Sequence, residues 1–144
     1  MTIIALDYGD RRIGLAINTE GDFVFARPYI PRKSNSQAID CIIDFLRRED
    51  VDLIVLGAPY NMDDSQGEAM DKVLAFKKAL EKKIRYTNRL VKRPEVDLWD
   101  ERNTTTRAEE ILIQQDVSRS RRKEIIDSLA ASLLLEDYLK EKGA

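Results

Sequence analysis

The sequence predicts an α/β fold in which helices flank a mixed five-stranded sheet. Strand-like and helical segments follow one another in the order βββαβαβαα, without an internal repeat. Polar turns join the first three strands, as in an antiparallel meander, whereas each later strand follows a helix, which implies parallel crossovers. With 144 residues, of which 43% are hydrophobic and 35% charged, the chain can bury one core. We therefore expect 1–144 to form a single domain.

The first half of the chain supplies three strands and one helix. Ile3 to Gly9 is an almost unbroken apolar run, as expected for a central strand that is covered on both faces. After a polar turn, apolar residues at alternate positions form a second strand, and 23–29 forms the third. A helical repeat begins at Ser34 or Ser36. The apolar face of this helix consists of Ile39, Ile42, Ile43 and Leu46.

Two more strands follow in the second half, with a helix between them. Val51 to Gly57 reads as a second fully buried strand, and 96–100 as a short one. Each is preceded by a helix, so both strands should run parallel to the first. The inner face of the intervening helix is predicted to consist of Met70, Val73, Leu74 and Leu80.

Two helices end the chain. Thr106 and Glu109 fit a capping box that opens a helix through Ile111, and 116–120 interrupts it. The last helix, over about 121–140, is apolar nearly all round, so we expect it to be buried against the sheet. Its apolar residues are Ile125, Ile126, Leu129, Ala130, Ala131, Leu133, Leu134, Leu135 and Tyr138.

The composition limits the chemistry that the chain can perform. Histidine is absent, which excludes imidazole as a base, nucleophile or metal ligand, and with it zinc sites and Ser-His-Asp triads. The 26 acidic and 24 basic side chains remain, together with hydroxyls, and carboxylate oxygens favour Mg²⁺ or Mn²⁺. The single cysteine, Cys41, lies in an apolar helical repeat, which predicts a buried core residue.

Three absences in the sequence bear on location and assembly. No segment approaches the ~20 consecutive apolar residues of a membrane helix, and no basic signal region precedes the first strand. We therefore expect a cytoplasmic protein that contacts no membrane. Once the helix faces are assigned to the core, no apolar stripe remains for a large symmetric interface, so we expect a monomer or a weak homodimer.

Asp7 is the first candidate for a functional carboxylate. It lies at the carboxyl end of a buried central strand, where ligands of open α/β sheets usually bind. An ionised carboxylate without a partner in an apolar setting costs several kcal/mol. Asp7 therefore either caps the turn through Gly9 and Asp10 or coordinates a cation, and its position alone leaves both interpretations open.

Two further acids are candidates for the same site. Asp127 is the one carboxylate in the apolar stretch of the last helix, although it could instead pair with Lys123 at a rim position. Asp100 and Glu101 end the last strand, and only one of them can point into a shared site because adjacent strand residues face opposite ways. Two strand ends and a packed helix could hold two cations about 4 Å apart, which suits phosphodiester cleavage.

Basic side chains concentrate in one stretch of a chain with a formal net charge of −2. Between residues 77 and 93 eight cations accompany the single acid Glu81. These cations are Lys77, Lys78, Lys82, Lys83, Arg85, Arg89, Lys92 and Arg93. A second basic group, 119–123, lies close to Asp127 in the sequence. Such runs are most often solvated helix faces, but two of them around an acidic centre also suit a phosphate backbone.

Four motifs make the chain resemble the YqgF family over essentially its whole length. They are Asp7-Tyr8-Gly9 with Arg12-Ile13-Gly14, Gly57-Ala58-Pro59 with Asn61-Met62-Asp63, Asp100-Glu101-Arg102 with Thr104-Thr105, and Ile126-Asp127-Ser128 with Ala130-Ala131. The resemblance implies a ribonuclease H-like fold related to Holliday junction resolvases and a nuclease that matures the 5′ end of pre-16S ribosomal RNA. It further implies that Asp7, Glu101 and Asp127 are catalytic acids that bind Mg²⁺ or Mn²⁺. Asp64 and Asn103 depart from the family's usual residues.

Two other functions remain open from the sequence. A Holliday junction resolvase would use the same acids and fold, but it would have to dimerise to make paired cuts. A non-catalytic RNA-binding module, acting in transcription or ribosome assembly, would use the acids only to cap turns. Actin-like ATPases share the Asp-x-Gly turn, but they close a nucleotide between two such domains, and this chain has the length of one. We expect nucleic acid, and ribosomal RNA precursor above all, as the partner.

Overall fold

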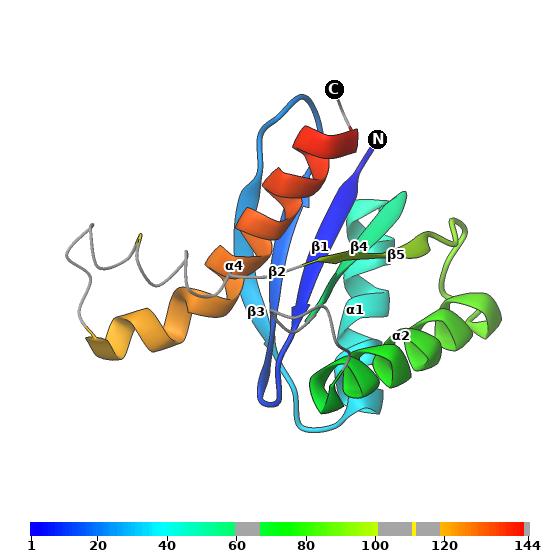
Figure 1. Cartoon of the computed structure of the whole chain (residues 1–144). Coiled ribbons are helices and arrows are strands. Elements are labelled where there is room, and N and C mark those ends of the chain that lie inside the picture. Colours follow the sequence, from blue (N-terminus) through cyan, green and yellow to red (C-terminus); the bar gives the residue numbers. More distant parts are fainter. Residues whose placement is uncertain (60–66, 101–110, 112–118, 143–144) are drawn as a thin grey trace.

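A computed structural model describes residues 1–59, 67–100, 111 and 119–142, and for residues 119–128 it describes the backbone alone. The elements of the described residues are β1 (Ile3–Tyr8), β2 (Arg12–Asn18), β3 (Phe25–Pro31), α1 (Asn35–Glu49), β4 (Leu53–Ala58), α2 (Glu68–Tyr86), β5 (Glu95–Asp100) and α4 (Arg119–Lys142) (Figure 1). Ile111 is also helical, as predicted, whereas 101–110, with the predicted capping box, lies outside the described residues. No helix in the described ranges is long and apolar enough to span a membrane.

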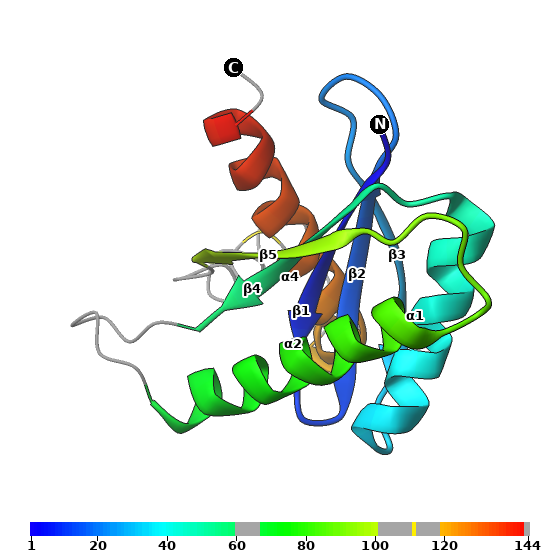
Figure 2. The same ribbon diagram turned by 90° about the vertical axis from the view of Figure 1, so that its right-hand side faces the viewer.

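The five strands form one mixed sheet, as the sequence predicts. Their order is β3-β2-β1-β4-β5. The neighbouring pairs among β1, β2 and β3 are antiparallel, whereas β4 runs parallel to both β1 and β5. Helices α1 and α2 lie on one side of the sheet and α4 on the other (Figure 2). The central strand β1 is therefore covered on both faces.

Alternate residues of β1 belong to two separate cores. Ile4 and Leu6 pack with α1 and α2, whereas Ile3 and Ala5 pack with α4. This alternation follows from the two-residue period of a strand, and burial on both faces explains why the run reads as continuously apolar. The α1/α2 core is the larger one, and it contains Phe76, which is fully buried.

The last helix packs mainly across β2 and also against β1 and β3, which confirms its predicted burial. Ala131 shares a core with Ala5 of β1 and Ala16 of β2, and all three side chains are fully buried. Small side chains on both surfaces let the helix backbone approach the sheet closely. Leu134 and Tyr138 continue the buried stripe toward the carboxyl end of α4.

The third strand begins two residues later than predicted. The side-chain amide of Asn18 donates hydrogen bonds to the backbone oxygens of Glu20, Gly21 and Phe23. These bonds extend the β2–β3 turn through Phe23, whose side chain is 67% exposed. The strand can therefore start only at Phe25. A pattern of alternating hydrophobic residues gives no indication that a side chain caps the turn in this way.

Three other expectations were wrong in detail. Leu74 is exposed, and the inner face of α2 continues through Phe76 and Ile84 instead. Cys41 is also exposed, because it lies just outside the buried stripe of α1, where its sulfur accepts a hydrogen bond from the side chain of Gln37. The interruption predicted at 116–120 is too long, since α4 begins at Arg119. Residues 116–118 lie outside the described part of the chain.

A small ionic cluster ties the segment before β1 to the α1–β4 and α2–β5 connections at the amino end of the sheet. The Asp52 carboxylate accepts a hydrogen bond from the backbone N–H of Thr2 at 2.7 Å, and it lies 2.8 Å from the Lys92 ammonium. Lys92 also contacts the carboxylate of Asp50 at 3.1 Å. The hydrogen bond from Lys92 and that from Thr2 lower the pKa of Asp52, while the bonds to Asp52 and Asp50 raise the pKa of Lys92.

This cluster predicts an acid-side loss of stability. Because the pKa of Asp52 is lower in the folded state, its stabilising effect is complete above the ordinary value of 3.8 and is lost as the pH falls through the folded value. Asp52→Asn should lower the free energy of unfolding at neutral pH and make it less sensitive to pH below about 4, as measured by urea unfolding across a pH series. Asp22→Asn, at an exposed turn position, is the control. Identical pH profiles for the two variants would contradict the prediction.

Candidate active site at the carboxyl edge of the sheet

The structure places Asp7 at the carboxyl end of the central strand. Asp7 pairs with Gly14 of β2 and is only 9% exposed. Aspartate side chains are ordinarily ionised at neutral pH. The alternation of Ile3 and Ala5 continues to Asp7, so its side chain shares the face that α4 covers. A carboxylate in this position must have its charge stabilised by neighbouring groups. Asp7 is therefore a buried acid on the face that carries the last helix.

The turn after Asp7 is tight. A Cβ atom on Gly9 would lie 2.6 Å from the backbone oxygen of Arg12, closer than real Cβ contacts come. Glycine is therefore required at this position for the chain to reverse between β1 and β2. Asp7 is thus held at the end of a strand whose continuation is sterically fixed.

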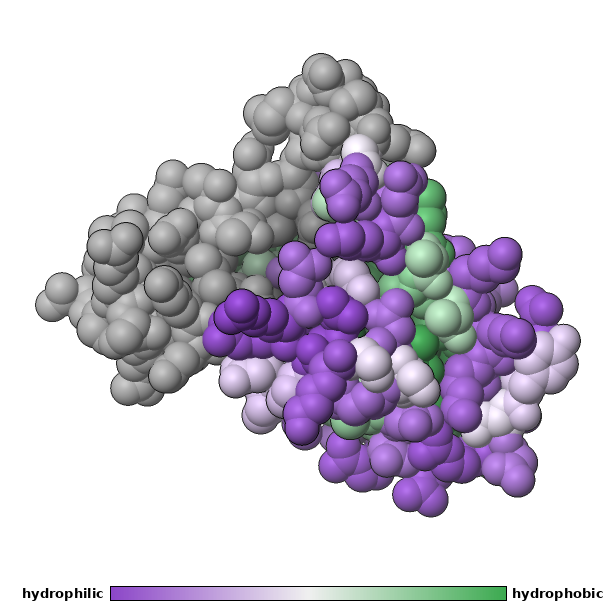
Figure 3. Space-filling model, turned by 90° about the horizontal axis from the view of Figure 1, so that it is seen from below, coloured by the Kyte–Doolittle hydropathy of each residue, from purple (hydrophilic) through white to green (hydrophobic). Residues whose placement is uncertain are grey.

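An open depression of about 400 Å³ lies beside this turn, between the carboxyl ends of β1 and β4 and the start of α2. It is lined by Tyr8, Gly9, Asp10, Pro59, Glu68, Ala69, Lys72 and Val73. The Lys72 ammonium and the Asp10 carboxylate form an exposed ion pair of 3.5 Å across it. Seen from below, the described surface is mainly hydrophilic, with a narrow apolar strip (Figure 3). The depression gives the carboxyl edge room for a polar ligand next to the turn.

The other two predicted acids are not placed in full. Glu101 lies outside the described residues, and for Asp127 only the helical backbone of α4 is described. The structure therefore does not test whether the three acids converge. Among the residues whose side chains are described, no group of three or more acids or cysteines could hold a metal ion. Asp64 and Asn103, which differ from the family's usual residues, also lie outside the described ranges.

Asp100 precedes Glu101, and its position in β5 indicates which of these two acids can face the same side of the sheet as Asp7. Val96 and Leu98 of β5 pack with the α1/α2 core, and Asp100 continues their alternation. Asp97 and Trp99 take the other face, where Asp97 accepts a hydrogen bond from the Tyr138 hydroxyl at 3.2 Å. Asp100 thus belongs to the face of the sheet opposite to Asp7.

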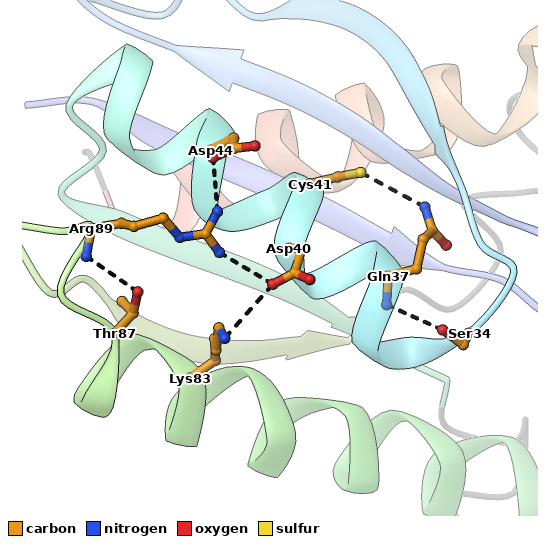
Figure 4. A network of polar contacts seen from close by, with 8 residues as sticks. All are labelled: Ser34, Gln37, Asp40, Cys41, Asp44, Lys83, Thr87 and Arg89. Atoms are coloured by element: carbon orange, nitrogen blue, oxygen red, sulfur yellow. Dashed lines mark hydrogen bonds and ion pairs between the residues drawn. The ribbon is translucent and has the colours of Figure 1, made fainter.

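Many cations of the basic run contact other groups of this chain, and two of them, Lys83 and Arg89, join α2 and the following connection to α1 (Figure 4). The two terminal nitrogens of Arg89 contact the carboxylates of Asp44 at 3.0 Å and Asp40 at 3.1 Å, and Lys83 contacts Asp40 at 3.7 Å. Arg93 donates to the backbone oxygens of Ile84 and Thr87. Lys77 pairs with Glu81, and Lys92 belongs to the Asp52 cluster. Most of this run is therefore occupied by intramolecular contacts.

Sequence reasoning missed Arg32, the residue that contacts the β1–β2 turn most extensively among the described side chains. A single arginine between a strand and a helix has no periodic signal. The available clue was its place between the third strand and the helix cap at Ser34, where a long fork of donors can reach a neighbouring turn.

Comparison with known proteins identifies the relatives of this chain. Residues 1–141 match the family described as "RuvX: Holliday junction resolvase". A protein of Halothermothrix orenii named "Putative pre-16S rRNA nuclease" is 39% identical over 140 residues, which cover 96% of this chain and 94% of that protein. A protein of the same name from Thermus thermophilus is also 39% identical, and the match covers 96% of this chain and 97% of that protein.

Solved structures share the fold at low sequence identity. The Fowlpox virus resolvase, in complex with its substrate Holliday junction DNA, matches 98% of both chains with a TM-score of 0.58 and 16% identity. Thermus thermophilus RuvC, in complex with a Holliday junction substrate, matches 100% of this chain and 97% of that chain with a TM-score of 0.55 and 10% identity. The predicted ribonuclease H-like fold is thereby confirmed.

The contacts of Arg89 predict a structural effect of its removal. Arg89→Ala breaks two ion pairs between α1 and the α2–β5 connection, so it should lower the melting temperature, with a loss of up to about 1 kcal/mol for each pair. Lys78→Ala, at an exposed position of α2, should leave the melting temperature unchanged. Thermal unfolding of both variants checks this. An unchanged melting temperature for Arg89→Ala, together with weaker nucleic-acid binding, would instead support the phosphate-binding interpretation.

Proposed function

Because this chain belongs to the RuvX family, the YqgF family that its motifs resemble, we propose that it is a metal-dependent nuclease that matures the 5′ end of pre-16S ribosomal RNA. Nuclease activity is supported by the names of relatives that match nearly the whole chain. The observation that carries the site is the burial of Asp7 at the carboxyl end of β1. We further propose that 1–144 act as one domain in the cytoplasm.

The proposed catalytic and metal-binding residues are Asp7, Glu101 and Asp127. Asp7 is supported by its burial on the face that α4 covers, and Glu101 by the assignment of Asp100 to the opposite face. In α4, position 127 is one turn before the buried Ala131, on the helical repeat that continues to Leu134 and Tyr138. Two strand ends and one helix would then contribute one carboxylate each.

The donor set fits hard divalent cations. Carboxylate oxygens are the ligands that Mg²⁺ and Mn²⁺ prefer, and a buried carboxylate is stabilised by a cation. Bound ions of this kind supply activation of water and stabilisation of the leaving oxygen in phosphodiester hydrolysis. The protein's own contribution is to hold the carboxylates on rigid elements.

A Holliday junction resolvase remains the second candidate. The description of the matching family and the substrates named with the two solved structures favour it. We prefer RNA because relatives at 39% identity are named for pre-16S ribosomal RNA, whereas the solved resolvases are only 10–16% identical. The proposed assembly is a monomer or weak homodimer, and it needs no symmetric pair of sites.

Replacing Asp7 tests whether the protein is an enzyme or a binding module. Asp7→Asn keeps the volume and removes the charge, so metal-dependent cleavage should fall roughly 100-fold or more, since a lost ligand removes several kcal/mol of stabilisation. The measurement is cleavage of precursor RNA under single-turnover conditions with and without Mg²⁺. Asp10→Asn, at a side chain that is 76% exposed, is the matched control and should remain active. Equal rates for wild type and Asp7→Asn would leave only the non-catalytic RNA-binding role.

The identity of the substrate is tested by comparing the cleavage of two nucleic acids. Wild-type protein with Mg²⁺ or Mn²⁺ should cleave pre-16S RNA near its mature 5′ end and leave a four-way DNA junction largely intact. The molecular mass of the protein should correspond to one or two chains. Gel analysis of both substrates and light scattering in the same buffer provide the readouts. Symmetric paired nicks in the junction by a dimer, with the RNA uncut, would replace this proposal with the resolvase.

A further inference from the structure

Arg32 contacts every residue of the turn that joins β1 to β2. Its Nε donates to the backbone oxygen of Gly9 at 3.0 Å, and its Nη2 donates to the backbone oxygen of Asp10 at 2.6 Å. The backbone N–H of Arg32 donates to the oxygen of Arg11 at 2.8 Å. One residue therefore satisfies three consecutive acceptors.

The same guanidinium also fixes the residue next to Asp7. It lies over the ring of Tyr8 at 5.2 Å, and the Tyr8 ring also packs against that of Phe76, with the ring centres 4.6 Å apart. Asn35 joins the two side chains, because its Oδ1 accepts from the Tyr8 hydroxyl at 2.9 Å and from Arg32 Nη1 at 3.2 Å. Tyr8 is thus held by stacking and by a hydrogen bond.

Fixing Tyr8 also fixes the orientation of Asp7. Tyr8 packs with the α1/α2 core, so its neighbour Asp7 must point to the α4 face. A rotation of the backbone at this strand end would move both side chains together. Arg32 itself acts on the face of the sheet opposite to Asp7, and it therefore influences Asp7 through the backbone.

We propose that Arg32 is a positioning residue, which clamps the β1–β2 turn and thereby holds Asp7 in the geometry that metal binding requires. This inference rests on the proposed function, in which Asp7 is a metal ligand. The clamp needs the planar fork of arginine, since three separate nitrogens contact Gly9, Asp10 and Asn35. Charge alone would not reproduce it.

Two substitutions separate the clamp from a simple cation. Arg32→Lys keeps the positive charge and loses the fork, whereas Lys33→Ala removes a neighbouring exposed charge and leaves the fork intact. The measurements are Mn²⁺ binding by titration calorimetry, amide hydrogen exchange of residues 8–12, and the Mn²⁺ concentration that gives half-maximal cleavage. Thermal unfolding confirms that each variant is folded.

The clamp predicts a distinct set of results. Arg32→Lys should bind Mn²⁺ about 10- to 100-fold more weakly than wild type, as is typical when a group that orients a ligand is removed. Its turn amides should exchange faster, and its cleavage rate should recover at saturating Mn²⁺. Asn35→Ala should also weaken Mn²⁺ binding and speed the exchange of the turn amides, because it removes the acceptor shared by Arg32 and Tyr8. Lys33→Ala should match wild type throughout.

Two other outcomes would overturn the proposal, and they differ. If wild type binds Mn²⁺ and Arg32→Lys binds it equally well, with unchanged exchange of the turn, the positioning role fails while the metal site stands. If wild type binds no Mn²⁺ at all, the metal site of the proposed function fails, and the positioning role of Arg32 fails with it.

Discussion

Burial of β1 on both faces is the constraint on which the arrangement of this molecule depends. Helices α1 and α2 cover one side of this strand and α4 covers the other, so every residue from Ile3 to Leu6 is assigned to one core or the other. A shift of one residue in the strand register would exchange the two sets. It would also turn Asp7 away from α4 and place it against the α1/α2 core. The packing of four apolar residues therefore determines on which face the candidate catalytic carboxylate lies.

The α4 face is held in register by different means on its two sides. Over β1 and β2 the contact relies on small side chains, since Ala5, Ala16 and Ala131 are fully buried. Near β5 it relies on Tyr138, which packs edge-on against Trp99 at 5.2 Å and donates to Asp97. Burial and this hydrogen bond raise the pKa of Tyr138, so its hydroxyl remains a donor at all physiological pH values. The strand that leads to Glu101 is thereby tied to the helix that contains Asp127.

The sequence was sufficient where a periodic pattern decides the structure, and insufficient where one side chain does. Burial on two faces predicted β1 and β4. The helical repeat predicted a start of α1 at Ser34 or Ser36, and the structure selects Ser34 as the cap, which accepts from the N–H of Gln37 at 3.1 Å. Asn18 extended a turn and shifted β3, which no hydrophobic pattern could indicate. Cys41 and Leu74 lie at the margins of helical stripes, where a rotation of a few tens of degrees decides exposure. For the site, the sequence predicted the place of Asp7 and missed Arg32.

The local density of charge in the sequence does not show which cations are available to a polyanion, because it ignores what folds against each cation. Arg89 belongs to the most basic stretch of the chain, yet its guanidinium forms ion pairs with two aspartates of α1. Arg93, in the same stretch, donates hydrogen bonds to backbone carbonyls. Arg32, outside that stretch, is likewise occupied by carbonyls. At the carboxyl edge, Lys72 pairs with Asp10, and Glu68 also lines the depression beside Gly9. The lining of this depression contains two carboxylates and one ammonium group, so in the proposed mechanism divalent cations would supply attraction for phosphates as well as the chemistry.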